Sequence, residues 1–455
     1  MRPATGRHYH RSMTPAGLHL VPRPSSLVAL GGRVVVDDRA AVRIDLDPSR
    51  ADLGLEGYEL RIDGSGVHGV AATEHGRWNA GRTVEQLWVD RGADGSLPSM
   101  RIVDVPRFAW RGAMLDVARH FFSVAEVQRF VEHIAAYKLN RLHLHLTDDQ
   151  GWRIEIPSWP SLTEVGGRSA AYGDEGGWFT LDEYAAIVHH AAEHFVTVVP
   201  EIDLPGHTHA ALASVPELNV GGVAPPLYHG IEVGFSTLRL DLPITERFLD
   251  DVIGTVAAAT PGDHVHIGGD EAHSTDRGDY LAFIDTLQRI VESHGKVMIG
   301  WEETAAAHLR PGSIVQHWLF PESARQAPPT TRYVMSPARH VYLDMRHAAD
   351  DAFGRRWAGA IDVDTAYDWD PADLGVTADD TRIEGVEAPL WTEKVSTIEQ
   401  LETLCFPRLL ALAEVGWTPR SLRVTSEFLG RAAVHAERLR RAGVAAYRSS
   451  SFPPV

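Results

Sequence analysis

The stretch HVHIGGDE, residues 264–271, joins a strand-like run to two glycines and two adjacent acids. Val265 and Ile267 alternate with two histidines, as apolar and polar side chains do along a β-strand. Glycines at a strand end let the chain bend or approach a neighbouring segment closely. Because successive strand side chains point to opposite faces, Asp270 and Glu271 can share one cleft only where regular strand geometry breaks. We therefore expect a strand followed by a bent loop that carries two carboxylates.

Seven further stretches after residue 105 have the length and apolar character of buried strands. They are WRGAMLDVA (110–118), NRLHLHLTD (140–148), FVTVVPEID (195–203), KVMIGWEE (296–303), SIVQHW (313–318), RYVMSP (332–337) continuing towards VYLD (341–344), and GVEAPLWTE (385–393). Amphipathic helical patterns lie between them, and eight such units predict an α/β fold with a (β/α)8 TIM barrel. A doubly wound open sheet is the alternative, although no glycine-rich phosphate loop follows any of these strands.

The expected helix starts support this alternation. A hydroxyl residue followed three positions later by glutamate can form a capping box, which satisfies backbone N–H groups at a helix N-terminus. Three such pairs are present: Ser123 with Glu126, Thr180 with Glu183, and Ser396 with Glu399. We expect a helix to begin directly after each of these hydroxyl residues.

A change of pattern near residue 105 predicts two structural units. Before it lie short alternating runs, RVVVDD (33–38) and YELRIDG (58–64), and a helical pattern, AGRTVEQLWVD (80–90). These features are typical of a small α/β module. We expect a disordered start at residues 1–15, a small α/β accessory domain at 16–105, the catalytic barrel at 106–445 and a tail at 446–455.

Composition and charge limit the kinds of molecule that this chain is expected to bind. The chain has 455 residues and 44% apolar content, enough for a sizeable core. Acidic residues outnumber basic ones by 61 to 43 and the net charge is −18, so nucleic acid and anionic membrane are not expected partners. The lone cysteine, Cys405, lies in a helical pattern and is expected to be a buried structural thiol. Residues 1–26 lack the apolar run of a signal peptide, which predicts a cytoplasmic protein.

Polar and aromatic side chains gather where the predicted strands end, which is where barrel enzymes keep their catalytic groups. One Asp after a strand is usually a turn or helix cap, and an Asp-Glu pair can simply complement the dipole of a helix N-terminus. A group at nearly every strand end instead predicts an active site. The candidates are Arg119, Asp148, Asp203, His207, Asp270, Glu271, Trp301, Trp318, Tyr342, Asp344, Trp391 and Glu393.

Nine blocks resemble the family-20 glycoside hydrolases, the β-N-acetylhexosaminidases, in order and spacing. They are MLDVARHF (114–121), HLHLTDDQGWR (143–153), PEIDLPGHTHA (200–210), HIGGDE (266–271), GWEE (300–303), QHW (316–318), YLD (342–344), APLWTE (388–393) and ALAEVGW (411–417). The resemblance implies an exo-acting, retaining enzyme that removes terminal β-linked N-acetylglucosamine, or N-acetylgalactosamine, without a metal or cofactor. In that family the substrate's own 2-acetamido oxygen attacks the anomeric carbon and forms an oxazolinium intermediate.

The resemblance also implies the catalytic roles. Glu271 would be the general acid and then the base. Asp270 would orient the acetamide and stabilise the positive charge that develops on it, and Tyr342 would donate a hydrogen bond to the acetamide carbonyl. Two neighbouring acids tend to separate their pKa values, which suits one protonated and one ionised group.

The remaining candidates resemble substrate-binding residues. Trp301, Trp318 and Trp391 would surround the acetamide and the sugar ring. Arg119 and Glu393 would hold the 3- and 4-hydroxyls, because an arginine fork and a carboxylate suit that pairing.

Four more acidic and histidine candidates complete the predicted site. Asp344 would contact the outer hydroxyls, closing the pocket around one terminal sugar. Asp148 and His207 would lie at the substrate site and, with Asp203, orient Glu271 and tune its proton affinity.

Two other function classes are consistent with parts of the sequence. His143-x-His145 in LHLHLTDD (142–149) resembles the paired ligands of metal-dependent barrel hydrolases, although it also suits a strand with a packed polar face. A sugar-binding relative without activity would need a damaged acid pair, whereas both acids are present. The lack of an export signal favours small saccharides as substrates, and the 4-hydroxyl preference, linkage and oligomeric state are left open.

Overall fold

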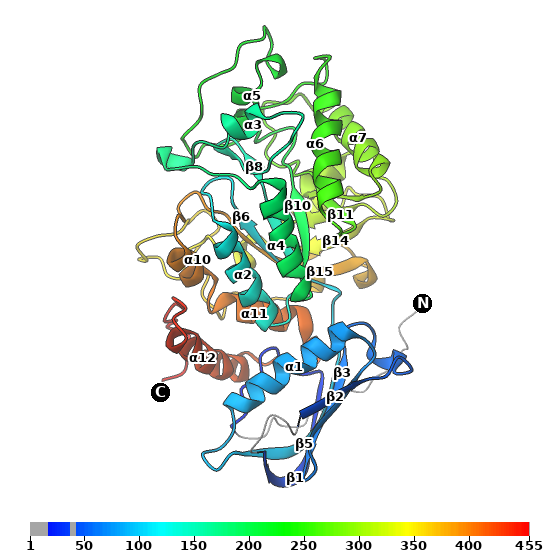
Figure 1. The fold of residues 1–455 in the computed structure, drawn as a ribbon, viewed down its shortest axis with the longest axis vertical. Helices are drawn as coiled ribbons and strands as arrows, with labels where there is room; N and C mark the ends of the chain where they lie inside the picture. Colours follow the sequence, from blue (N-terminus) through cyan, green and yellow to red (C-terminus); the bar gives the residue numbers. More distant parts are fainter. Residues whose placement is uncertain (1–16, 37–41, 455) are drawn as a thin grey trace.

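Eight parallel strands close into a barrel in the computed structural model, which describes residues 17–36 and 42–454 (Figure 1). The strands are β6 (Trp110–Asp116), β7 (Arg141–His145), β10 (Thr197–Glu201), β11 (His264–His266), β12 (Val297–Trp301), β13 (Ile314–His317), β14 (Arg332–Met335) and β15 (Ile383–Leu390). Each pairs with the next along the chain, and β15 pairs with β6 to close the ring. The predicted (β/α)8 barrel is confirmed, with all eight predicted strands in it.

Helices surround the barrel unevenly. The longer ones are α2 (Val124–Ala136), α4 (Leu181–Glu193), α6 (Thr245–Ala259), α7 (Arg277–Ser293), α10 (Ile398–Cys405), α11 (Arg408–Trp417) and α12 (Thr425–Arg441), and the short ones are α3 (Ser161–Glu164), α5 (His209–Ser214), α8 (Pro321–Ala324) and α9 (Ala338–Val341). Phe130 and Ile134 of α2 and Ile187 of α4 are fully buried, so the apolar faces of these helices join the core. After β12 only a 3-10 turn follows, at 302–306, which leaves room there for loops.

Two of the three predicted capping boxes are confirmed. Ser123 and Thr180 each accept a hydrogen bond from the backbone of the glutamate three residues on, and each glutamate accepts one in return. The third box is wrong. Helix α10 begins at Ile398 with Thr397 as its N-cap, whose hydroxyl accepts from the Gln400 amide at 3.3 Å. The helix starts one residue later than expected, because the hydroxyl of Thr397, rather than that of Ser396, caps its first turn.

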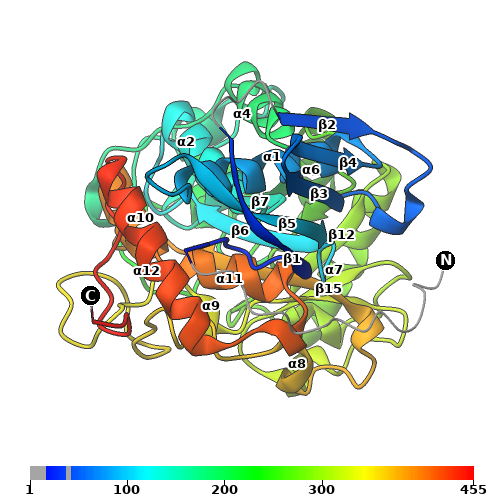
Figure 2. The ribbon, with the colours of Figure 1, turned by 90° about the horizontal axis from the view of Figure 1, so that it is seen from below.

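Within residues 17–36 and 42–105, the N-terminal module forms a five-stranded sheet covered by one α-helix. Its strands, in the order β1-β5-β3-β4-β2, are β1 (Ser26–Val35), β5 (Ser96–Asp104), β3 (Tyr58–Asp63), β4 (Gly66–Ala71) and β2 (Val42–Leu46). Helix α1 (Glu74–Val89) lies between this sheet and the barrel, as Figures 1 and 2 show. The indole N–H of Trp417, from α11, donates to Asp104 at 2.8 Å and so joins the barrel to the module. The small α/β accessory unit is thus confirmed.

Other expectations have mixed outcomes. Cys405 is fully buried, as predicted, and burial raises the pKa of its thiol. None of the helices in the described ranges is long and apolar enough to cross a membrane, and the cytoplasmic location stays a prediction.

Residues 446–454, expected as a tail, pack on the barrel: the Tyr447 ring stacks on His347 at 4.0 Å. The expected disordered start at 1–15 and the end of the run at 33–38 lie outside the described residues.

Candidate active site

The two glycines after β11 let the chain approach Asp203 at a distance that no side chain allows. Gly268 has a φ of +66°, and a Cβ there would lie 1.7 Å from Oδ1 of Asp203. Gly269 has a φ of +100°, and its amide donates to the same oxygen at 3.1 Å. Only glycine adopts such backbone angles without strain, and only glycine fits the gap. The Gly-Gly pair therefore holds the loop against the end of β10.

Glu271 completes the break in strand geometry. Its φ is +45°, a left-handed angle that is rare for a residue with a side chain and that marks functional sites more often than others. The reversal lets Asp270 and Glu271 both line one cavity. Helix α7 starts only at Arg277, with Asp276 as its N-cap. The two acids therefore do not cap a helix, and that alternative is wrong.

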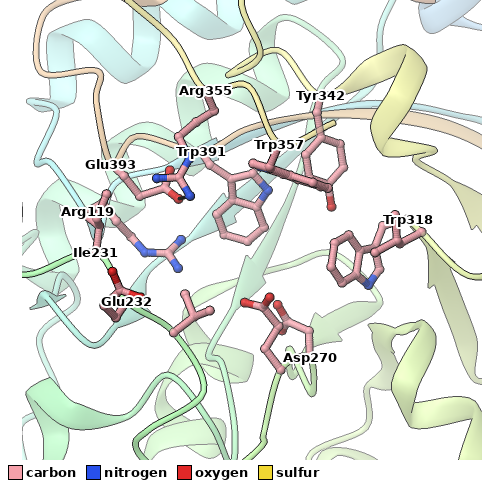
Figure 3. A pocket seen from close by; sticks show the side chains of 13 residues that line it. Arg119, Ile231, Glu232, Asp270, Trp318, Tyr342, Arg355, Trp357, Trp391 and Glu393 are labelled. Atoms are coloured by element: carbon pink, nitrogen blue, oxygen red, sulfur yellow. Dashed lines mark ion pairs between the residues drawn. The ribbon is translucent and has the colours of Figure 1, made fainter. Parts of the chain in front are cut away.

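The cavity has a volume of about 430 Å³ and opens at the carboxyl ends of the strands. It is lined by seven of the predicted residues and six others: Arg119, Asp270, Glu271, Trp318, Tyr342, Trp391 and Glu393, with Ile231, Glu232, Val233, Leu319, Arg355 and Trp357. In Figure 3, Arg119 and Glu393 lie on one side of the cavity and Trp318 and Tyr342 on the other. Asp270 lies between the two sides.

Aromatic rings form one wall of the cavity. Trp318 and Tyr342 lie nearly parallel, with ring centres 6.2 Å apart, and Trp357 meets both edge-on at 5.9 and 5.5 Å. Trp391 packs against Trp301 at 5.8 Å. Trp301 is almost fully buried and does not line the cavity, so it supports Trp391 from behind. Flat rings of this kind suit the C–H faces of a sugar and a planar acetamide.

The opposite wall carries an arginine and a carboxylate. Arg119 forms an ion pair with Asp148 at 2.7 Å and lies over the Trp391 ring at 4.8 Å. Burial opposes its charge, yet Asp148 and Asp116 raise the pKa of Arg119 well above its ordinary value. One Glu393 oxygen lies 3.8 Å from Arg355, and the other is buried without a hydrogen-bond partner in the described part of the chain. This wall therefore offers both donors and an acceptor to hydroxyl groups.

Behind the acid pair, His207 connects the two acids to Asp148. Its Nδ1 lies 3.2 Å from Oδ1 of Asp148, and its Nε2 lies 3.7 Å from Glu271 and 3.8 Å from Asp270. Burial opposes a charge on the ring, but Asp148 and Asp203 raise the pKa of His207 well above its ordinary value. His207 and Asp148 are buried and do not line the cavity. His207 contacts the two acids and Asp148 contacts Arg119, so both residues lie behind the side chains that line the cavity.

Comparison with known proteins identifies the family. The profile of the glycosyl hydrolase family 20 catalytic domain matches residues 108–280 and 274–420, and that of the family's domain 2 matches residues 25–105. This chain belongs to glycosyl hydrolase family 20. It is therefore a glycoside hydrolase, as the sequence resemblance implied, and the domain 2 match covers the accessory module.

Several characterised relatives of this family-20 hydrolase are similar over nearly its whole length. A β-N-acetylhexosaminidase of Cellulomonas fimi is 41% identical over 410 residues, covering 88% of this chain and 82% of that protein. The N-acetyl-β-hexosaminidase of Streptomyces plicatus, solved in complex with thio-NAglucal, is 40% identical with a TM-score of 0.90, covering 99% of this chain and all of that one. An exo-β-N-acetylglucosaminidase of Vibrio harveyi, solved with N-acetylglucosamine, is 28% identical with a TM-score of 0.82 and covers 98% of this chain and 81% of that one.

The pKa of both acids of the hydrolase is raised. Burial comes first in each case, and the charge of Asp270 then raises the pKa of Glu271 further. The Glu271 side chain is 29% exposed and that of Asp270 only 10%. Both pKa values therefore move upward from their ordinary range.

The histidines of the alternative metal site contact buried carboxylates. His143 lies 2.8 Å from Glu387 and 3.0 Å from Glu201, and His145 lies 2.5 Å from Glu201. Glu201 also accepts from the Trp301 indole at 2.9 Å. Side chains alternating along β7 thus form a polar network inside the barrel, beneath the cavity. These contacts fit the packed polar face that the sequence allowed.

Sequence patterns missed the residues that come from long loops. Arg355 and Trp357 lie between β14 and β15, and Glu232 lies in the segment between α5 and α6. None of them follows a predicted strand, so the strand-end pattern could not select them. Asp344 was predicted, but it is buried beside the cavity and does not line it. Burial, followed by the charge of Glu393, raises the pKa of Asp344 well above its ordinary value.

Proposed function

We propose that this enzyme removes single β-linked N-acetylhexosamine residues from the non-reducing ends of saccharides, with retention of configuration and with the substrate's acetamide as nucleophile. The observation that carries the proposal is the placement of Asp270 and Glu271, consecutive residues on one bent loop that both line the cavity. Two carboxylates that serve one cluster of reacting atoms need such adjacency. A retaining enzyme with its own nucleophile instead places two carboxylates about 5–5.5 Å apart on opposite sides of the bond.

The first step breaks the glycosidic bond. Glu271, whose pKa is raised by burial, donates its proton to the leaving oxygen as the acetamide oxygen attacks the anomeric carbon. The bond from that carbon to the leaving group breaks, and the acetamide nitrogen gains positive charge. Asp270 accepts a hydrogen bond from the acetamide N–H and stabilises that positive charge. Tyr342, whose pKa is raised first by burial and then by Asp270, stays protonated and can donate to the acetamide carbonyl oxygen.

The second step releases the sugar. Glu271, now ionised, removes a proton from water, and the water oxygen attacks the anomeric carbon from the face that the leaving group vacated. The bond to the acetamide oxygen breaks and the acetamide is restored. Two inversions at the same carbon give overall retention. His207, charged and near both acids, stabilises the state in which Glu271 is ionised.

Exo action is supported by the shape of the cavity. Arg119 and Glu393 stand on the side away from Trp318 and Tyr342, where the outer hydroxyls of a bound sugar would lie (Figure 3). Their polar atoms suit hydroxyl groups rather than a continuing chain. The names of the relatives, β-N-acetylhexosaminidases and an exo-β-N-acetylglucosaminidase, support the same substrate class. An inactive sugar-binding role is disfavoured because the whole acid pair and Tyr342 line the cavity.

The purified chain should hydrolyse aryl β-N-acetylglucosaminides and shorten a chitooligosaccharide by one sugar at a time. The product observed first by NMR should be the β-anomer of N-acetylglucosamine. Comparing kcat/KM for the matching N-acetylgalactosaminide measures the 4-hydroxyl preference. Release of disaccharides, or of the α-anomer first, would contradict exo action or retention respectively.

Replacing His207 with glutamine should shift the pH profile upward. The positive charge of His207 lowers the pKa of both Asp270 and Glu271, so its loss should raise both. When the pH rises above the pKa of Glu271, the acid loses its proton and activity falls. When the pH drops below the pKa of Asp270, which works ionised, activity falls as well. Both limbs of the kcat/KM profile should therefore move to higher pH. A lower rate with an unmoved profile would mean that His207 acts only through packing.

A further inference from the structure

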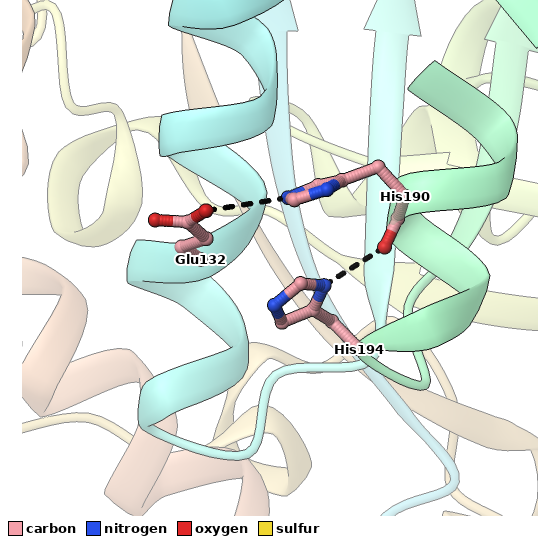
Figure 4. A group of neighbouring side chains, drawn as sticks. All are labelled: Glu132, His190 and His194. Carbon is pink, nitrogen blue, oxygen red and sulfur yellow. Dashed lines mark hydrogen bonds and ion pairs between the residues drawn. The ribbon is translucent and has the colours of Figure 1, made fainter. Parts of the chain in front are cut away.

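A second group of side chains capable of binding a ligand lies on the outer face of the barrel, away from the cavity. Glu132 of α2 faces His190 of α4 and His194, the residue that caps the C-terminal end of α4, as Figure 4 shows. The Nε2 atom of His190 lies 3.5 Å from a Glu132 oxygen, and the two imidazole rings are 4.4 Å apart. One donor atom from each residue lies within 4.8 Å of the other two. The four-residue spacing places both histidines on one face of the helix.

Hydrogen bonds leave both histidines with a nitrogen available. Nδ1 of His194 lies 2.8 Å from the carbonyl oxygen of His190, and a carbonyl can only accept, so Nδ1 carries the proton. In the neutral ring, Nε2 of His194 then bears a lone pair, and metal-binding histidines commonly donate their other N–H to such a carbonyl. The Nε2 atom of His190 is buried and has no hydrogen-bond partner in the described part of the chain. Trp78 of α1 meets the His194 ring edge-on at 5.5 Å and holds its orientation.

We propose that Glu132, His190 and His194 bind one divalent transition metal ion, for which Zn²⁺ is the natural probe. Two imidazole nitrogens and one carboxylate oxygen suit zinc, with water completing the coordination. Zinc bonds of about 2.0–2.2 Å require the donor atoms to move slightly closer together. The Glu132 side chain is 57% exposed and can rotate, whereas that of His190 is 20% exposed and packed. Mg²⁺ and Ca²⁺ prefer oxygen ligands and should bind poorly.

The position of this site indicates what the ion would do. It would join α2 to α4, which pack against each other on the barrel surface. It would also lie beside α1 of the accessory module, because His75 stacks on Phe195, the residue after His194, at 4.9 Å. The C-terminal end of α4 leads into β10, whereas the cavity lies at the opposite ends of the strands. Zinc should therefore stabilise the fold without altering turnover of an aryl N-acetylglucosaminide.

The test compares zinc binding by the chelator-treated full chain and by three variants. We expect Zn²⁺ to raise the Tm of the wild type by at least about 2 °C, with calorimetry showing one bound ion more than in His190→Ala or Glu132→Gln. His190→Ala and Glu132→Gln should lose both effects. His189→Ala is the matched control: its side chain is 77% exposed, one residue away on the same helix, and should change nothing. The chain holds 24 histidines, and others of them can also bind zinc. The measurement is therefore the difference in zinc binding between the wild type and each variant.

A crystal grown with Zn²⁺ provides a direct readout. An anomalous scattering peak between Glu132, His190 and His194 supports the site, and a zinc peak only at other histidines overturns it. Equal binding and equal Tm shifts in the wild type and in His190→Ala also overturn it. Because the Glu132 side chain is largely exposed, Glu132→Gln should fold even if a histidine variant does not.

Discussion

Glu271→Gln should slow the hydrolysis of a disaccharide by about 10²–10⁴-fold, because a glutamine cannot donate the proton that a poor leaving group requires. An aryl glycoside whose phenol leaves readily needs little proton donation, so its bond-breaking step should slow much less. The measurement is kcat/KM for both substrates in the wild type and the variant. The ratio of the two losses isolates proton donation from binding.

A second carboxylate in the same cavity serves as the matched control. Glu232 also lines the cavity, but it is exposed and lies on the long segment between α5 and α6. Glu232→Gln makes the same carboxyl-to-amide change in the same cavity, so it should affect disaccharide and aryl substrates alike. Equal losses for both substrates in Glu271→Gln would show that Glu271 is not the acid, and would direct attention to the remaining carboxyl groups of the cavity.

The barrel was predictable because its strands are short apolar runs of strand length that alternate with longer amphipathic helical patterns. Positions on the strands were less predictable. Trp318 and Trp391 come one residue after β13 and β15 end, and both line the cavity. Trp301 is the last residue of β12, and its side chain is buried inside the barrel. A shift of one residue decides whether a strand-end tryptophan meets substrate or core.

The features of the site that the sequence could not predict are contacts between segments far apart in the chain. The sequence indicated that Gly268 and Gly269 permit a close approach, but not that Asp203 is the partner. Likewise, His207 was placed near Glu271 by resemblance, whereas the charge that it carries depends on Asp148. Such electrostatic effects arise only when the loops of several strands meet, and no local pattern encodes them.

The mechanism predicts that the acetamide of the substrate is indispensable. An aryl β-glucoside with a plain 2-hydroxyl should be turned over at least about 10⁵-fold more slowly than the matching N-acetylglucosaminide, because intramolecular nucleophiles reach effective molarities of about 10⁵–10⁸ M. The measurement is kcat for both substrates at saturating concentration. Competition by the glucoside against the N-acetylglucosaminide should show that it still binds.

A stable cyclic analogue of the oxazoline intermediate should inhibit competitively and more tightly than the product sugar, since mimics of reactive intermediates generally do. Tyr342→Phe keeps the ring but removes one hydrogen bond, so it should weaken the analogue by about 1 kcal/mol and leave binding of the plain glucoside nearly unchanged. Mass spectrometry of enzyme quenched during turnover should find unmodified peptides. A sugar attached to Asp270 or Glu271 would contradict substrate assistance, since the carboxylate would then have attacked the anomeric carbon in place of the acetamide oxygen.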